Sequence, residues 1–120
     1  TLVRKHFLAL HGLGLRDLHF SGPDLYLLAG PTMALDGDVR LFKWPNAKQA
    51  LADNREPVRF EAGLTALLTL PHQPGGDRAE AICQLPTGLA GHLPDWLVLY
   101  DAPGPGRQEG ECVIFGDLLR

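Results

Sequence analysis

The feature that most constrains the fold is an apolar run that is too short for a stable helix. Residues 25–29 (LYLLA) lie between two turn signals, SGP at residues 21–23 and GP at residues 30–31. Proline cannot donate a hydrogen bond to a strand ladder, so the second signal ends the run. An unbroken apolar run of this length is typical of a strand that is buried on both faces.

Two more strands are expected beside this run. Residues 15–20 alternate loosely between apolar and polar, and residues 39–44 (VRLFKW) follow a second turn signal, DGD at residues 36–38. Residues 39–44 also carry apolar side chains on both faces of the expected strand. The stretch from 14 to 44 therefore predicts three short antiparallel strands joined by tight turns.

A weaker copy of this stretch closes the sequence. Residues 95–103 (DWLVLYDAP) align with residues 24–31, residues 110–117 align with residues 37–44, and residues 80–85 replace the first strand. Repeated small sheets buried on both faces are typical of β-propellers, in which each blade lies between two neighbours. The prediction is an all-β fold of antiparallel sheets, forming about two blades of a β-propeller-like fold.

We expect residues 1–120 to form a single all-β fragment, the C-terminal part of a larger propeller-like domain. Its first unit covers residues 6–60 and its second unit residues 64–117. Other expected elements are a strand at 6–11 from a preceding blade, a helical turn at 47–52 capped by Asn46, a strand at 58–60, and a strand or helical turn at 64–70.

The same segments resemble a known family. They are GLGLRDL at 12–18, LAGPTMALDG at 28–37, LFKW at 41–44, EAI at 80–82 and LVLYDAP at 97–103. In these motifs the chain resembles the bacterial domain-of-unknown-function family numbered 3616. The resemblance implies a propeller-like β domain of unknown activity, of which this chain would be the C-terminal part.

Composition excludes some function classes. The net charge of −3 gives no electrostatic footprint for nucleic acid or an anionic membrane, and no apolar run approaches the ~18 residues of a membrane span. No signal-peptide pattern is visible, so the localisation stays open. Cys83 and Cys112 are expected to be free and buried, because an intervening strand would separate them.

The first strand of each unit begins with charged residues. They are Arg16 and Asp17 in the first unit and Glu80 in the second. One interpretation is a polar ring at a channel mouth that holds a small anion, a metal ion or a substrate. The other is an ion pair between Arg16 and Glu80 that fixes the register of neighbouring blades.

Carboxylates at the turns offer a second candidate site. Asp36, Asp38 and Asp101 could join Glu80 as oxygen ligands for Ca²⁺, although no EF-hand spacing is present. The alternative is that these residues accept backbone hydrogen bonds within their own turns. We predict no cofactor and assign no metal ligands, with Ca²⁺ as the one ion to test. The ligand-binding candidates are Arg16, Asp17, Asp36, Glu80 and Asp101.

No catalytic motif is present, since Ser21 is the only serine and lies in a turn. The expected function is a binding or scaffold module. The alternative is a Ca²⁺-dependent propeller hydrolase of phosphate or carboxyl esters, with its site near Asp17, Asp36 and Glu80. Residues 86–94 are expected to form a loop of excess length, where function often lies.

The expected partners are the remaining blades of a parent protein or a second copy of the chain, and neither nucleic acid nor a membrane. Two isolated blades would expose apolar faces, at Phe42 and Trp44 in the first unit and at Ile114 in the second. Exposed apolar faces and open strand edges promote association, so a dimer is expected.

Overall fold

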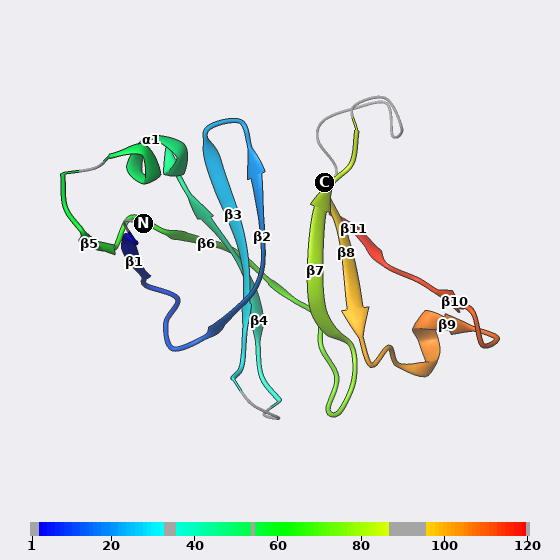
Figure 1. Ribbon diagram of the computed structural model, residues 1–120. Coiled ribbons are helices and arrows are strands. Elements are labelled where there is room, and N and C mark those ends of the chain that lie inside the picture. The colour runs from blue at the N-terminus through cyan, green and yellow to red at the C-terminus, as the bar shows by residue number, and fades with distance from the viewer. Residues whose placement is uncertain (1–2, 33–35, 54, 87–95, 120) are drawn as a thin grey trace.

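The computed structural model describes residues 3–32, 36–53, 55–86 and 96–119. Two antiparallel sheets lie side by side, and a short helix and a parallel strand pair flank the first of them (Figure 1). The all-β prediction is confirmed. Among the described residues, no helix has the length and apolar character that crossing a bilayer requires.

The first sheet has four strands in the order β2-β3-β4-β6. They are β2 (Gly14–Ser21), β3 (Asp24–Gly30), β4 (Val39–Trp44) and β6 (Thr65–Leu70). The three strands expected from the apolar runs and turn signals are therefore confirmed. Residues 65–70 are a strand and not a helical turn, and they pair with β4 instead of starting the second sheet.

An excursion separates β4 from β6. It contains helix α1 (Ala47–Ala52) and strand β5 (Val58–Glu61), both at the expected places. Asn46 at the start of α1 is left-handed, with φ 53°, and its side chain caps nothing. Its backbone N–H instead donates to Asp24 Oδ1 at 2.8 Å, so the proposed side-chain cap is wrong.

Strand β1 (Lys5–Leu8) pairs in parallel with β5. The predicted outer strand of a preceding blade is therefore wrong. This segment instead forms a two-stranded ladder that joins the N-terminal segment to the excursion. Sequence pattern indicates a strand but carries no information about its distant partner.

The second sheet has three strands in the order β7-β8-β11. They are β7 (Arg78–Gln84), β8 (Trp96–Asp101) and β11 (Asp117–Leu119). Between β8 and β11 lie the short helix η1 (Pro105–Arg107) and a hairpin of β9 (Gln108–Glu109) and β10 (Val113–Ile114). The expected third strand at 110–117 is wrong, because Gly110, with φ 65°, lies in a turn that folds this segment back on itself.

The repeat extends to a bulge in the first strand of each sheet. In β2 the register shifts between Leu15 and Asp17, which leaves Arg16 as the extra residue. In β7 it shifts between Ala79 and Ala81, which leaves Glu80 as the extra residue. An extra residue bends the strand and re-aims its side chain.

The matching bulges define equivalent positions in the two sheets. Leu28 pairs with Asp17, the residue after the first bulge, and Leu99 pairs with Ala81, the residue after the second. Leu28 is 0% exposed, whereas Leu99 is 46% exposed. Equivalent leucines are therefore covered in the first sheet and open in the second.

Two apolar clusters bury both faces of the first sheet. The cluster between the sheets contains Leu28, Val39, Leu41, Leu70, Ala79, Ile82, Trp96, Val98 and Tyr100. The cluster on the other face contains Leu10, Leu25, Leu27, Ala29, Phe42, Trp44 and Ala47. Burial on both faces is as predicted, but a like sheet covers only one face. Helix α1 and the N-terminal segment cover the other, so Phe42 and Trp44 are buried and not exposed as expected.

Among the described residues, the second sheet is buried on one face only. Its alternate residues Cys83, Leu97, Leu99 and Leu118 point away from the first sheet, and we call them the outer face. Cys83 and Cys112 are free, as predicted, but both are exposed. Cys83 follows buried Ile82 on an alternating strand, which places its thiol on the outer face.

Candidate functional site

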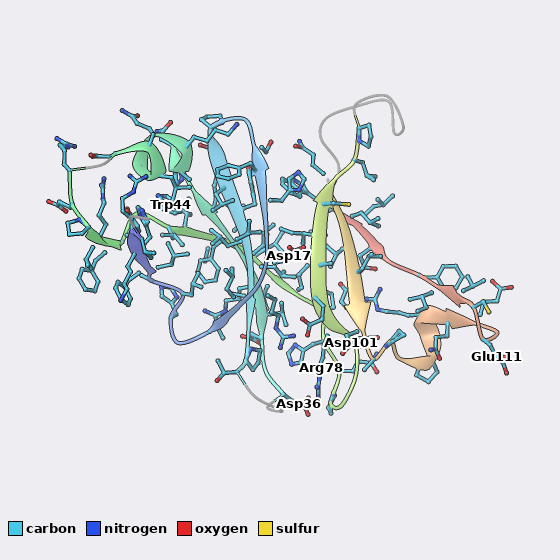
Figure 2. The ribbon with its side chains drawn as sticks, viewed as in Figure 1. Asp17, Asp36, Trp44, Arg78, Asp101 and Glu111 are labelled. Carbon is cyan, nitrogen blue, oxygen red and sulfur yellow. The ribbon has the colours of Figure 1, made fainter. Side chains whose placement is uncertain are left out.

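Four of the five predicted site residues lie where β2 and β7 are side by side, a junction that we call the seam: Arg16, Asp17, Asp36 and Glu80. Figure 2 shows Asp17 between the two sheets and Asp36, Arg78 and Asp101 together at one end. Asp17 comes from β2, and Arg78 and Asp101 pair across β7 and β8. The structure therefore brings four of the candidates to one junction, and Asp101 lies at the exposed end of β8.

Arg16 and Glu80, the two bulge residues, form an ion pair across the seam. Arg16 Nη2 also donates to the Pro31 carbonyl at 3.1 Å, and its side chain is only 13% exposed. A β-carbon at position 30 would overlap the Arg16 guanidinium, so Gly30 makes this path possible. The interpretation of Arg16 and Glu80 as an ion pair between neighbouring sheets is confirmed.

Asp17 is a second link across the seam. Its Oδ1 accepts the Leu18 N–H and its Oδ2 accepts the Ile82 N–H, both at 2.8 Å. The carboxylate thus satisfies a backbone donor of β7, the edge strand of the second sheet. The equivalent residue in the second sheet is Ala81, which has no group that could bind a further sheet in this way.

Asp36 accepts the Gly75 N–H at 3.2 Å and lies 3.5 Å from Arg78 Nη2. The space beside Arg16, Asp36 and Arg78 has a volume of about 10 Å³, roughly one water molecule. Asp101 is exposed. In residues 3–32, 36–53, 55–86 and 96–119, no group of three or more His, Cys, Asp or Glu side chains could hold a metal ion. The seam carboxylates act as acceptors for protein donors.

A larger pocket lies beside α1. It has a volume of about 600 Å³, and the polar or aromatic residues in its wall include Trp44, Gln49, Asp53, Arg55, Arg59 and Glu61. We call it the α1 pocket. Its walls come from the end of β4, from α1 and from β5, so the excursion between β4 and β6 builds most of it.

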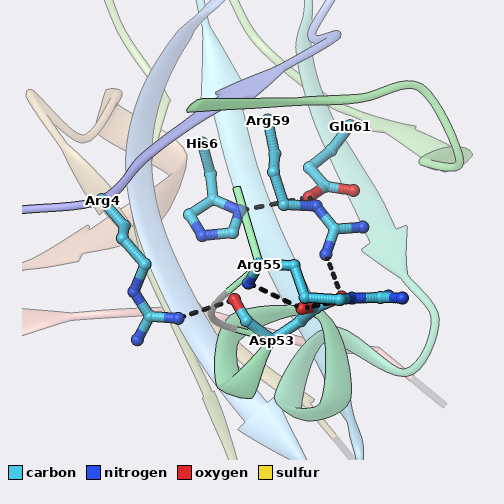
Figure 3. A network of polar contacts seen from close by, with 6 residues as sticks. All are labelled: Arg4, His6, Asp53, Arg55, Arg59 and Glu61. Carbon is cyan, nitrogen blue, oxygen red and sulfur yellow. Dashed lines mark hydrogen bonds and ion pairs between the residues drawn. The ribbon is translucent and has the colours of Figure 1, made fainter. Parts of the chain in front are cut away.

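Arg59 links the two carboxylates of the α1 pocket (Figure 3). Its Nη1 donates to Asp53 Oδ2 at 2.9 Å, and its Nε lies 3.3 Å from Glu61 Oε1. Asp53 also accepts hydrogen bonds from Arg55 Nε at 2.9 Å and Nη2 at 2.5 Å. The Arg55 hydrogen bonds hold the pKa of Asp53 well below its usual value, with Arg59 adding a smaller effect.

Two residues near the N-terminus complete the network. His6 Nδ1 lies 3.1 Å from Glu61 Oε1, and Arg4 Nη1 donates to the Asp53 carbonyl at 2.7 Å. These contacts join β1 to the far side of the excursion. Residues distant in the sequence therefore help to hold the wall of the α1 pocket in place.

Sequence reasoning missed the α1 pocket entirely. Residues 45–57 are polar and suggested only a surface excursion. One sequence signal could have pointed to this region. Acidic and basic residues alternate closely between Asp53 and Glu61. That alternation indicates mutual pairing, but it does not show that the paired groups line a pocket.

Another polar cluster links η1 to the second sheet through Arg107. Tyr100 Oη donates to Asp117 Oδ2 at 2.6 Å, and Arg107 Nη1 donates to Asp117 Oδ1 at 2.7 Å. The Arg107 guanidinium lies 3.8 Å from the centre of the Tyr100 ring. Burial raises the pKa of Tyr100, and the Arg107 hydrogen bonds lower the pKa of Asp117.

The family described as "Protein of unknown function (DUF3616)" matches residues 1–117. The chain belongs to this family. The family match confirms the resemblance to DUF3616 that the sequence motifs indicated. Comparisons with curated proteins and with solved structures gave no match. The loop at 86–94, which sequence length marked as a candidate, lies almost wholly outside the residues that the structure describes.

Proposed function

We propose that this DUF3616 chain is a non-catalytic binding or scaffold module whose sheets stack face to face, as blades do in a β-propeller. In this proposal another sheet covers the outer face of the second sheet. The observation that carries it is the contrast between Leu28 and Leu99. They occupy equivalent positions beside matching bulges, yet one is fully covered by the next sheet and the other is 46% exposed.

The outer face has the chemistry of a packing surface. Leu97 pairs with Cys83 on one side and with Leu118 on the other, which makes a continuous apolar strip across the three strands. Leu118 is 54% exposed, and Ile114 on the adjoining hairpin is also 54% exposed. Contiguous apolar surface of this kind marks interaction sites.

The sheet that covers this face would come from the remaining blades of a parent protein. In the isolated chain a second copy would supply it. A hydrolase at the seam has no supporting observation, because the groups that such a site would use are bound to protein. Asp17 holds the Ile82 N–H, Asp36 holds the Gly75 N–H, and Glu80 pairs with Arg16.

The test is sedimentation velocity of the isolated chain over a range of concentrations. We expect the wild-type chain to associate as its concentration rises and Leu99→Glu to abolish this association. Burying the introduced carboxylate in an apolar interface would cost a large desolvation free energy. The matched control is Leu15→Glu, because Leu15 in β2 is 47% exposed against 46% for Leu99. A wild-type chain that stays monomeric at high concentration would contradict the proposal.

The hydrolase alternative has a separate test. Thermal unfolding is followed with and without Ca²⁺, for the wild type and for Asp36→Ala. We expect Ca²⁺ to leave the melting temperature of both proteins unchanged, because Asp36 already accepts hydrogen bonds from Gly75 and lies near Arg78. A Ca²⁺-dependent rise that Asp36→Ala removes would favour the hydrolase instead.

A further inference from the structure

We infer that the α1 pocket binds a small organic anion through its carboxylate or phosphate group. This inference concerns a different surface from the outer face, so it does not depend on sheet stacking. It rests on an imbalance between the hydrogen-bond donors and acceptors that the pocket leaves unused.

The acceptors in the pocket are occupied. The Asp53 carboxylate accepts three hydrogen bonds from Arg55, through its N–H, Nε and Nη2, and one from Arg59 Nη1. The Glu61 carboxylate faces His6 Nδ1 at 3.1 Å and Arg59 Nε at 3.3 Å. The Asp53 carboxylate therefore has little capacity left for a ligand that donates hydrogen bonds, and the side chain of Glu61 is only 11% exposed.

The donors are not exhausted. A guanidinium carries five N–H groups. Within the described part of the chain, Arg59 Nη2 and Arg55 Nη1 have no hydrogen-bond partner. The side chain of Arg55 is 85% exposed and that of Arg59 is 27% exposed, so both are within reach of a ligand. Surplus guanidinium donors match carboxylate and phosphate oxygens, which are acceptors only.

The rest of the wall suits a carbon skeleton. Trp44, Pro45 and Ala50 line the same pocket as the arginines. A volume of about 600 Å³ lies in the range of small-molecule sites. Glu56 lines an adjoining cavity of about 190 Å³ with Asp53, Arg55 and Arg59, which limits how far a second negative group could extend. The geometry thus favours one anionic group on a compact, partly apolar frame.

The experiment titrates the chain with glucuronate, with glucose as the matched neutral probe, and with inorganic phosphate, using calorimetry. We expect glucuronate to bind at least about tenfold more tightly than glucose, since a charge-assisted hydrogen bond contributes that much. Phosphate should compete with glucuronate. Binding of phosphate alone would assign the site to phosphate groups, and binding of glucuronate alone to carboxylates.

Variants separate the pocket from the fold. Arg59→Gln should lower the affinity for the anion about tenfold and remove the preference over glucose. Arg55→Gln, at a far more exposed side chain, is the second variant should Arg59→Gln not fold. Arg40→Gln is the control, because Arg40 is ion-paired to Asp38 on another part of the molecule. Equal binding of glucuronate and glucose, no binding of either anion, or wild-type affinity in both pocket variants would overturn the inference.

Discussion

Arg16 shows how one residue can join two sheets. Its guanidinium meets Glu80 and the Pro31 carbonyl, and it fills the space that a side chain at Gly30 would occupy. A buried charge is tolerated only when it is paired and hydrogen-bonded. The ion pair at this bulge therefore links the two sheets.

Replacing Arg16 with methionine should weaken the whole fold. The change keeps most of the apolar stem but removes the ion pair and the hydrogen bond to Pro31, so we expect the free energy of unfolding to fall by about 1–3 kcal/mol. Urea denaturation measures this loss. The control is Arg40→Met, which breaks an ion pair of partly exposed side chains and should cost less than about 0.5 kcal/mol. Equal losses in the two variants would show that the seam ion pair does not stabilise the fold.

Tyr100 should make stability depend on alkaline pH. Burial and the Asp117 hydrogen bond raise the folded-state pKa of Tyr100 above its usual value of 10.0. As the pH rises past 10.0, the unfolded chain loses this proton before the folded chain does, which favours unfolding. The stabilisation is therefore complete below that pH and is lost above it.

The Tyr100→Phe variant tests this dependence. We expect its free energy of unfolding to fall less steeply above pH 10 than that of the wild type, measured by denaturant unfolding at several alkaline pH values. The ultraviolet absorbance of phenolate gives a direct check in the wild type. Parallel slopes in the two proteins would contradict the proposed role of this hydroxyl.

Single residues differed in how well they could be predicted. The pairing of Arg16 with Glu80 was foreseen as one of two readings, because both residues begin the first strand of a repeat. The contacts of Arg4 and His6 with the excursion could not be foreseen, since they depend on β1 lying parallel to β5. A local pattern defines a residue's neighbours along the chain but not those brought in by a distant strand.

At the level of elements, local signals found the strands and failed to find their partners. Strands β2, β3 and β4 lie between clear turn signals and were predicted almost to the residue. Strand β6 was also expected, but nothing in its sequence indicated that it pairs with β4 across an excursion. The prediction of a sheet strand where β9 and β10 form a hairpin was wrong. Residues 113–115 are a run of apolar residues like those in β4, and this run suggested a similar strand.

The two equivalent leucines allow a matched comparison of the sheets. Leu28→Ala should lower the free energy of unfolding by about 2–5 kcal/mol, because the side chain is 0% exposed and its loss leaves a cavity. Leu99→Ala should lower it by less than about 1 kcal/mol in the monomer, because water already reaches that side chain. Urea denaturation of both variants at low protein concentration measures the difference.

The comparison has a second arm at high concentration. If the outer face binds another sheet, Leu99 becomes buried there and the cost of Leu99→Ala should increase with protein concentration. The cost of Leu28→Ala should stay constant. A concentration-independent Leu99→Ala effect would speak against burial of the outer face.

Across the whole molecule, two apolar surfaces lie at opposite ends (Figure 1). One is the outer face of the second sheet. The other is the exposed side of β1 and β5, where the rings of Phe7 and Phe60 stack at 5.1 Å and are 50% and 80% exposed. Parallel strands are usually covered on both faces, so this side also lacks a covering layer.

Charge differs between the half of the sequence that contains β1 and β5 and the half that contains the outer face. Residues 1–64 contain eight Lys and Arg against seven Asp and Glu, whereas residues 65–120 contain three against seven. Opposite charge favours contact between unlike ends of two copies over contact between like ends. Such a head-to-tail interface would be heterologous, so each copy would keep one free end.

Mixing two variants tests the head-to-tail arrangement. Phe60→Glu blocks one end and Leu99→Glu blocks the other, so each variant alone should be monomeric in sedimentation experiments. An equimolar mixture should form a dimer but nothing larger, because one intact end of each kind remains. The dimer should weaken as the salt concentration rises. A mixture that stays monomeric would exclude this arrangement.

The thiol of Cys83 lies on the outer face, beside Leu97, while the thiol of Cys112 lies in the turn of the hairpin. An alkylating reagent can reach both groups in the free chain. Once another sheet settles over the outer face, Cys83 should be shielded while Cys112 keeps reacting. The protein thus carries a built-in chemical reporter of its own assembly, with an internal reference on the same chain.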